Sequence, residues 1–205
     1  MRELLIATTN AGKAREFRQM LGEDRIAWLD PASIGAPEVE ETGRTFRDNA
    51  CLKAAAYAVQ SGKWTIADDS GLEVDALGGE PGVFSGRWAA INGAGEGDPA
   101  NNALLLQRLD AVPDEGRSAR FVCSLALSDP MGRIAMTSFG CVSGRILRKP
   151  RGSNGFGYDP LFLIDSLGKT TAELAPQEKH RISHRGEALR RLRQLIDQHL
   201  PARPV

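Results

Sequence analysis

Two adjacent carboxylates, Asp68 and Asp69, form the pattern in this sequence that most strongly suggests chemistry. They follow the apolar run Trp64 to Ala67 and precede Ser70 and Gly71, which predicts a strand end where the chain turns. Because side chains alternate along a strand, one carboxylate should face a cleft and the other the supporting framework. Such carboxylates suit Mg²⁺, and an aspartate beside that metal could activate water. An ordinary Asx-type turn before Gly71 would also explain the pair.

A second candidate site follows the first predicted strand, which runs from Glu3 to Thr8. It consists of Thr8, Thr9, Asn10, Ala11, Gly12 and Lys13. Apolar residues recur at helical spacing after this segment, so its polar groups should lie at a helix N-terminus. Unpaired N–H groups and the helix dipole favour phosphate there, and Lys13 adds a full charge. Threonine and asparagine also serve as ordinary helix caps, which is the alternative.

Three glutamates, Glu38, Glu40 and Glu41, stand close together before a predicted helix that opens at Thr45, with Asp48 as its capping-box partner. Such clustered carboxylates repel one another without a counter-ion. A metal shared with Asp69 would relieve the repulsion. A solvated acidic loop near a helix N-terminus is the simpler alternative.

The segment from Arg151 to Pro160 is rich in glycine, which lets a backbone approach a ligand closely. Within it, Phe156 could stack on a planar base and Asp159 could accept hydrogen bonds from a base edge. A glycine-rich hairpin loop with a buried aromatic residue is the alternative. Further donors, at Lys179 and in the run Ser183 to Gly186, precede the last helix, although a cap with surface charges would explain them equally well.

The remaining pattern predicts a chain that is not purely βαβ. Two β-rich runs, Ala119 to Leu127 and Arg133 to Leu147, should form a hairpin, and a short strand, Leu161 to Ile164, should precede the closing helix. The connection from Gly78 to Pro99 is long and rich in Gly, Pro and Asn, which favours a mobile flap. Arg87 in that flap could reach a substrate or brace the loop.

The composition is that of an ordinary globular protein of 205 residues in which 26 Lys and Arg balance 26 Asp and Glu. No overall field therefore attracts nucleic acid or a membrane surface, and no apolar run could span a bilayer. The N-terminal residues are too soon interrupted for a signal peptide, and Cys51, Cys123 and Cys141 lack any Cys-x-x-Cys pairing. We expect buried free thiols in a cytoplasmic protein.

Five ordered segments taken together resemble the inosine triphosphate pyrophosphatase family, and most closely its bacterial non-canonical purine NTP diphosphatases. They are ATTNAGKAREF, EETGRTFRDNA, IADDSGLEVDALGGEPGVFSGRW, NGFGYDP and EKHRISHRGEAL. The resemblance covers almost the whole chain, residues 1–205. It implies an α/β fold: one domain with an elongated mixed β-sheet and flanking helices, in two lobes with the active site in a central cleft. It also implies a homodimer.

The resemblance implies Mg²⁺-dependent hydrolysis of ITP, dITP and XTP to the monophosphate and pyrophosphate, which removes these nucleotides before they enter DNA or RNA. By likeness, Asp69 would be the base for water and, with Glu40 or the adjacent Glu41, would bind Mg²⁺. The substrate would contact the Thr8 to Lys13 segment, Ser70, Phe156, Gly157, Tyr158, Asp159, Lys179, His184 and Arg185. Arg185 would donate to the six-keto oxygen, which ATP lacks. Thr9 stands where many relatives have glycine.

Two other functions remain open from the residues. The same carboxylates and cations could serve a Mg²⁺-dependent phosphatase that releases orthophosphate from nucleotides. A non-catalytic sensor of purine triphosphates is the other alternative, although binding alone does not require a positioned base.

Overall fold

The computed structural model describes residues 2–21, 26–29, 31 and 34–199. The chain divides into two compact units. Unit 1 comprises Met1–Asp69, Cys123–Gly140 and Arg185–Val205, and unit 2 comprises Ser70–Val122 and Cys141–His184.

The described residues form a 7-stranded sheet in the order β2-β1-β3-β4-β5-β6-β7. β1 pairs in parallel with β2 and β3, whereas β6 pairs antiparallel with β5 and β7. The strands are β1 (Arg2–Ala7), β2 (Ile26–Leu29), β3 (Trp64–Val74), β4 (Ser118–Ser128), β5 (Ile134–Ile146), β6 (Phe162–Ile164) and β7 (Lys169–Thr170). The prediction of a mixed sheet with flanking helices is confirmed.

The helices of the described residues are α1 (Ala11–Leu21), α2 (Phe46–Ser61), α3 (Trp88–Ile91), α4 (Gly97–Arg108), α5 (Pro176–Ile182) and α6 (His184–His199). α2 begins where the capping pattern predicted, because the Thr45 hydroxyl accepts from the Asp48 N–H over 3.1 Å. It ends at Gly62, whose φ of 64° suits a residue without a side chain. Within these residues no helix has the length and apolar character needed to cross a lipid bilayer.

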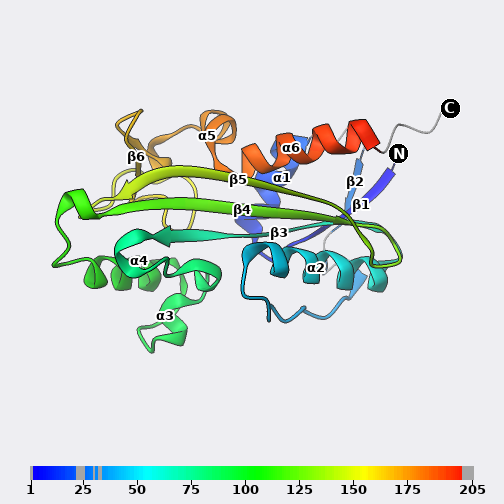
Figure 1. Cartoon of the computed structure of the whole chain (residues 1–205), viewed down its shortest axis with the longest axis horizontal. Coiled ribbons are helices and arrows are strands. Elements are labelled where there is room, and N and C mark those ends of the chain that lie inside the picture. Colours follow the sequence, from blue (N-terminus) through cyan, green and yellow to red (C-terminus); the bar gives the residue numbers. More distant parts are fainter. Residues whose placement is uncertain (1, 22–25, 30, 32–33, 200–205) are drawn as a thin grey trace. The chain divides into compact units, whose positions relative to one another are not determined.

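In unit 1, α1 and α6 lie on one side of the strands and α2 on the other (Figure 1). The strands are buried on both faces, so consecutive residues pack against different helices: Ile66 belongs to the cluster with Phe17 of α1 and Leu189 of α6, and Ala67 to the cluster with Ala54 of α2. This sandwich fixes which helix each side chain of β3 meets.

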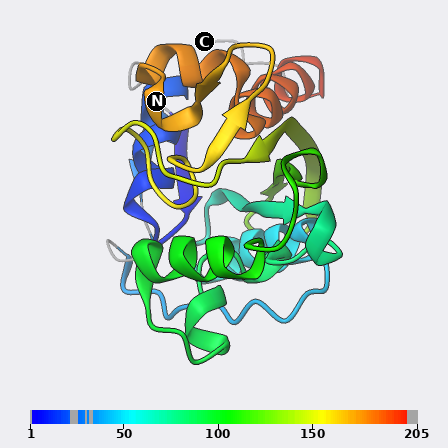
Figure 2. The ribbon, with the colours of Figure 1, turned by 90° about the vertical axis from the view of Figure 1, so that its left-hand side faces the viewer.

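In unit 2, one hydrophobic cluster joins α3 and α4 to the strands, with Trp88 and Leu105 among its largest buried members. α4 and α3 lie beside each other in this unit (Figure 2). The predicted flap, Gly78 to Pro99, is folded into this core: Asn101 accepts from the Ala89 N–H over 2.8 Å and donates to the Gly86 carbonyl over 3.2 Å. Motion of the segment on binding stays a prediction.

The predicted end of the strand at Ala67 is wrong. β3 continues through both aspartates as far as Val74, so Asp68 and Asp69 lie inside a strand and not in a turn. The prediction failed because the two aspartates interrupt the apolar pattern from which the strand was inferred. The hydrogen bonds of the strand nevertheless continue past them. Gly71 lets the segment around Gly82 and Ser85 pack against β3, since a Cβ at Gly71 would lie 2.3 Å from the Ser85 hydroxyl.

Candidate active site

Asp68 faces the side of β3 that α1 and α6 cover. Its Oδ2 lies 3.0 Å from the Lys13 ammonium and 3.3 Å from the Arg185 guanidinium, and its side chain is 0% exposed. Burial alone would raise the pKa of Asp68, but the Lys13 and Arg185 cations hold it well below its usual range. Asp68 is therefore a permanent anion that orients two cations.

Asp69 faces the α2 side, where Asn49 Nδ2 donates to its Oδ2 over 3.0 Å. Burial raises the pKa of Asp69 to about 6, against the lowering effect of the Lys53 and Lys13 ammonium groups, and the Glu41 carboxylate raises it further. A carboxylate in this range can accept a proton near neutral pH. Alternation along β3 thus gives neighbouring aspartates different chemistry, as predicted, although within a strand.

The segment 38–43, which contains the three glutamates, is held against α2 by Asn49. The Asn49 Oδ1 accepts from the Gly43 N–H over 2.7 Å while its Nδ2 reaches Asp69. Glu41 forms an ion pair with Lys53 of α2 at 2.5 Å, and both side chains are mostly buried. Glu40 is exposed. Of the two candidate metal carboxylates, Glu41 is therefore already neutralised by a lysine, whereas Glu40 is open to solvent.

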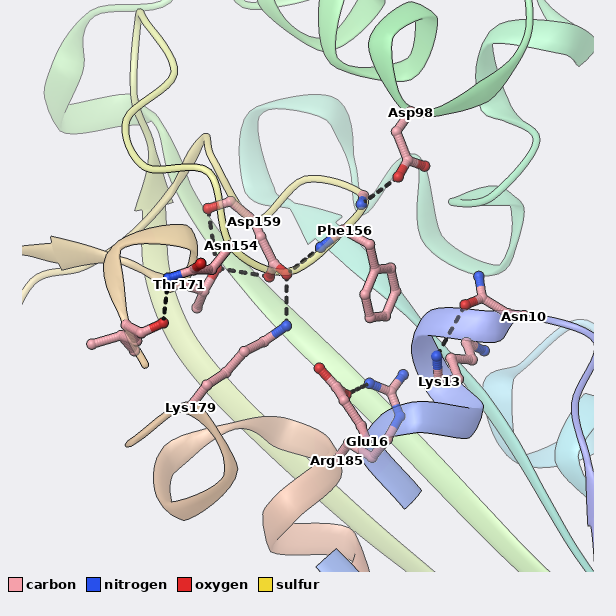
Figure 3. Close-up of polar contacts among 12 residues, drawn as sticks. Asn10, Lys13, Glu16, Asp98, Asn154, Phe156, Asp159, Thr171, Lys179 and Arg185 are labelled. Atoms are coloured by element: carbon pink, nitrogen blue, oxygen red, sulfur yellow. Dashed lines mark hydrogen bonds and ion pairs between the residues drawn. The ribbon is translucent and has the colours of Figure 1, made fainter. Parts of the chain in front are cut away.

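The first loop caps α1. Asn10 Oδ1 accepts from the Lys13 N–H over 3.0 Å, and the Thr8 hydroxyl accepts from the Asn10 N–H over 3.2 Å. Figure 3 shows Asn10 over the first turn of α1 with Lys13 beside it. Asn10 therefore caps α1, as the alternative interpretation of this segment proposed, whereas the Thr8 hydroxyl holds the turn that precedes the helix. Among the described residues positive φ occurs at glycine alone, so Thr9 is accommodated without strain.

Arg185 lies in a buried ion-pair cluster of unit 1. Its Nη1 contacts Glu16 Oε2 (Figure 3). Its Nη2 contacts Asp68, and its side chain is 2% exposed. In this structure the guanidinium is engaged by two carboxylates, and the predicted hydrogen bond from Arg185 to a base stays a prediction. Sequence reasoning missed Glu16 and Asn49, which lie inside the quoted motifs but gave no separate signal, and Lys53, which lies three residues after the second motif.

In unit 2, Asp159 organises the loop that the sequence identified as glycine-rich. Its Oδ2 accepts from the Phe156 N–H over 2.9 Å and from Lys179 Nζ over 2.6 Å, and its Oδ1 accepts from the Thr171 hydroxyl over 2.8 Å (Figure 3). A Cβ on Gly155 would lie 2.0 Å from the same carboxylate. Asp159 thus holds the loop through these three contacts, and its predicted contact with a base edge stays a prediction.

Phe156 and Lys179 lie together. The Lys179 ammonium is 5.0 Å from the centroid of the half-buried Phe156 ring, a distance at which cation and ring attract. The pairing with Asp159 leaves Lys179 only 5% exposed. This lysine therefore lies beside the predicted base platform.

The other predicted contacts fall in different surroundings. Tyr158 is buried in the core of unit 2, where its hydroxyl donates to the Ser85 carbonyl over 3.0 Å. The His184 ring stacks on Phe121 with centroids 5.0 Å apart. Tyr158 and His184 therefore contact other residues of unit 2 in this structure. Ser70 is half-buried on β3, directly after Asp69.

The oxygen ligands around Asp69 fit Mg²⁺. Within the described residues no group of three or more His, Cys, Asp or Glu side chains is arranged for a metal. Mg²⁺ does not need one, because it commonly takes one or two carboxylates and completes its shell with water and substrate phosphates. A buried carboxylate whose proton affinity is raised, with acidic residues close by, is a suitable donor set for this cation.

The comparison with protein families decides the identification. The model of the Ham1 family matches residues 4–195 of this chain. The chain belongs to the Ham1 family. The resemblance inferred from five motifs is confirmed.

Curated relatives of this Ham1 chain are similar over nearly their full length. The dITP/XTP pyrophosphatase of Bacillus licheniformis is 52% identical over 202 residues, which cover 97% of this chain and 100% of the relative. The dITP/XTP pyrophosphatase of Bacillus subtilis is 46% identical, with 96% and 98% of the two chains covered.

Solved Ham1 structures have the same fold. A HAM1 protein from Coxiella burnetii superimposes with a TM-score of 0.86 at 41% identity, covering 97% of this chain and 100% of that one. The dITP/XTP pyrophosphatase from Mycobacterium abscessus gives a TM-score of 0.74 at 43% identity, with 93% and 98% covered.

Proposed function

We propose that this Ham1 chain hydrolyses non-canonical purine nucleoside triphosphates, namely ITP, dITP and XTP, to the monophosphate and pyrophosphate. The observation that carries the proposal is the opposite character of Asp68 and Asp69 on one strand: a fixed anion that orients cations beside a carboxylate that can take a proton. Relatives named dITP/XTP pyrophosphatase support the substrate class.

Unit 1 would handle the phosphates and the water. Lys13, oriented by Asp68, can donate to further phosphate oxygens because an ammonium has three protons, and the N-terminus of α1 favours anions. Asp69 would orient the attacking water and accept its proton, held in place by the Asn49 amide. Attack at the α-phosphorus would then expel pyrophosphate.

Asp69 and Glu40 would hold Mg²⁺. Glu41 is less suitable as the second carboxylate, because taking it from Lys53 would break a pair that is mostly buried. Glu40, being exposed, can turn toward a cation at little cost. A bound Mg²⁺ would neutralise phosphate charge and make the α-phosphorus more electrophilic.

Unit 2 would recognise the base. The Phe156 ring offers a stacking surface, and the Lys179 ammonium beside it is a donor that suits the six-keto oxygen of hypoxanthine and xanthine. Adenine presents an amino group at this position, which cannot accept a hydrogen bond from the ammonium, so this contact would be lost with ATP. This assignment moves six-keto recognition from Arg185 to Lys179. We further propose that the enzyme acts in the cytoplasm as a homodimer.

Product analysis tests the proposal. Phosphorus NMR of ITP and ATP incubated with the protein and Mg²⁺ should show IMP and pyrophosphate from ITP, with ATP nearly unchanged. Orthophosphate as the product, or equal loss of ATP, would instead identify a general nucleotide phosphatase. Binding of ITP without any product would identify a sensor.

A further inference from the structure

Helix α4 contacts the Phe156 loop through two side chains that the motifs do not include. Asp98 Oδ2 accepts from the Gly157 N–H over 2.6 Å, and Asn102 Nδ2 donates to the Gly157 carbonyl over 2.9 Å. The two residues are four positions apart, so they lie on one face of the helix. Figure 3 shows Asp98 reaching the loop from the first turn of α4.

These contacts constrain the aromatic residue just before Gly157. The peptide group that precedes Phe156 is held by Asp159, which accepts from the Phe156 N–H over 2.9 Å. The peptide group that follows Phe156 is held by Asp98. With both flanking peptide groups fixed, the backbone dihedrals of Phe156 are fixed, and with them the direction in which its ring leaves the chain.

The conformation being held is one that the loop needs help to keep. Gly157 has a φ of 62°, in the left-handed region that glycine enters readily but also leaves readily. α4 itself is anchored by Leu104 and Leu105, which are 5% and 0% exposed. The helix therefore does not depend on the exposed Asp98 contact for its packing, whereas the loop gains order from it.

We propose that Asp98 and Asn102 are positioning residues for base recognition, which clamp Gly157 so that Phe156 presents its ring to the purine. This inference rests on the proposed function, because it takes Phe156 as the base platform. Removing either contact should weaken binding of the base moiety and leave binding of the phosphate moiety unchanged.

The test compares two probes, IMP and pyrophosphate, by calorimetric titration of the full-length protein in Mg²⁺. Asp98→Ala and Asn102→Ala should each weaken IMP binding about three- to tenfold, the range expected for loss of one hydrogen bond. Pyrophosphate affinity should stay within about twofold of the unmodified chain. With ITP as substrate, KM should rise by the same factor as the IMP dissociation constant.

Two matched variants separate the hydrogen bond from charge. Asp98→Asn keeps an oxygen acceptor for the Gly157 N–H and should restore IMP affinity. Glu96→Gln removes a carboxylate from the same helix end, at a residue whose side chain makes no capping hydrogen bond, and should have no effect.

The inference is overturned if both alanine variants bind IMP normally, or if IMP and pyrophosphate weaken equally. It is also overturned if Glu96→Gln reproduces the loss. Failure of the proposed function would look different: the unmodified protein would bind IMP but release no pyrophosphate from ITP.

Discussion

Asp68 and Asp69 are consecutive on β3, yet the carboxylate of Asp68 lies 3.0 Å from an ammonium group while that of Asp69 accepts an amide hydrogen bond over 3.0 Å. The strand sends them to opposite faces, and the helices on those faces supply different partners. Asp68 is thereby fixed as an anion, and the pKa of Asp69 is raised into the range of a general base.

The unfolding free energy of the metal-free protein should reveal the raised pKa of Asp69. Burial raises that pKa from 3.8 to about 6, so the folded state favours the protonated form. This contribution to stability is complete below pH 3.8 and is lost as pH rises through about 6. The Asp69→Asn side chain cannot ionise, so the unfolding free energy of this variant should exceed that of the unmodified chain. The difference should grow from less than about 1 kcal/mol at pH 4 to about 2–3 kcal/mol at pH 8.

Urea unfolding of both proteins in EDTA, at pH 4 and at pH 8, measures this difference in unfolding free energy. The same variant should lose hydrolysis of ITP. If the difference in unfolding free energy is the same at pH 4 and pH 8, then Asp69 does not titrate between these pH values.

Glu40 and Glu41 should respond differently when each carboxylate is replaced by an amide. Glu40→Gln should weaken Mg²⁺ binding by more than the roughly tenfold effect of changes outside the ligand shell, with little change in stability. Glu41→Gln should lower the unfolding free energy by about 1–3 kcal/mol, because it leaves the mostly buried Lys53 without this carboxylate. Titration calorimetry with MgCl₂ and urea unfolding give both quantities. The reverse pattern would assign the metal to Glu41.

The Glu16 to Arg185 ion pair should be worth far more than a surface pair on α6. Glu16→Gln removes one of two carboxylates from a guanidinium that is 2% exposed, and it should destabilise the fold by about 3 kcal/mol. Glu187→Gln breaks the ion pair with Arg191. The Glu187 side chain is 33% exposed and the Arg191 side chain 55%, so this variant should lose less than about 0.5 kcal/mol of unfolding free energy. Chemical denaturation of both variants decides the comparison, and similar losses would refute a special role for the buried cluster.

Gly155→Ala should damage base recognition. Its Cβ would meet the Asp159 carboxylate at 2.0 Å, and its φ of 80° is strained for alanine, so the loop must rearrange around Asp159. We expect KM for ITP to rise about tenfold or more, since about 1–3 kcal/mol of strain is placed on the loop. Gly86→Ala is the control, because nothing lies within 4 Å of its added Cβ. Steady-state kinetics with unchanged KM in Gly155→Ala would mean that the loop does not bind substrate.

Local patterns were readable from the sequence where local contacts decide the structure. The cap at Thr45 and the hairpin through 129–132 depend on residues within a few positions of each other, and both were predicted. The long strand β3 was not, because its aspartates are stabilised by distant partners. Arg185, which neutralises Asp68, is 117 positions away in the chain, and no sequence window contains both residues.

The N-terminal end of α4 could not be predicted from composition, because tertiary packing decides its structure. α4 begins at Gly97 and includes Pro99, residues that normally indicate a loop, yet its buried leucines hold it against the core of unit 2. The clamp from Asp98 to Gly157 therefore could not be foreseen. The motif around Phe156 identified the loop, but not the helix that holds it.

The position of water attack tests the central claim most directly. Hydrolysis of ITP in H₂¹⁸O, followed by mass spectrometry of both products, reports which phosphorus receives the oxygen. If Asp69 directs water to the α-phosphorus, all of the ¹⁸O will be in IMP and none in pyrophosphate. Label in pyrophosphate, or in orthophosphate, would contradict the account.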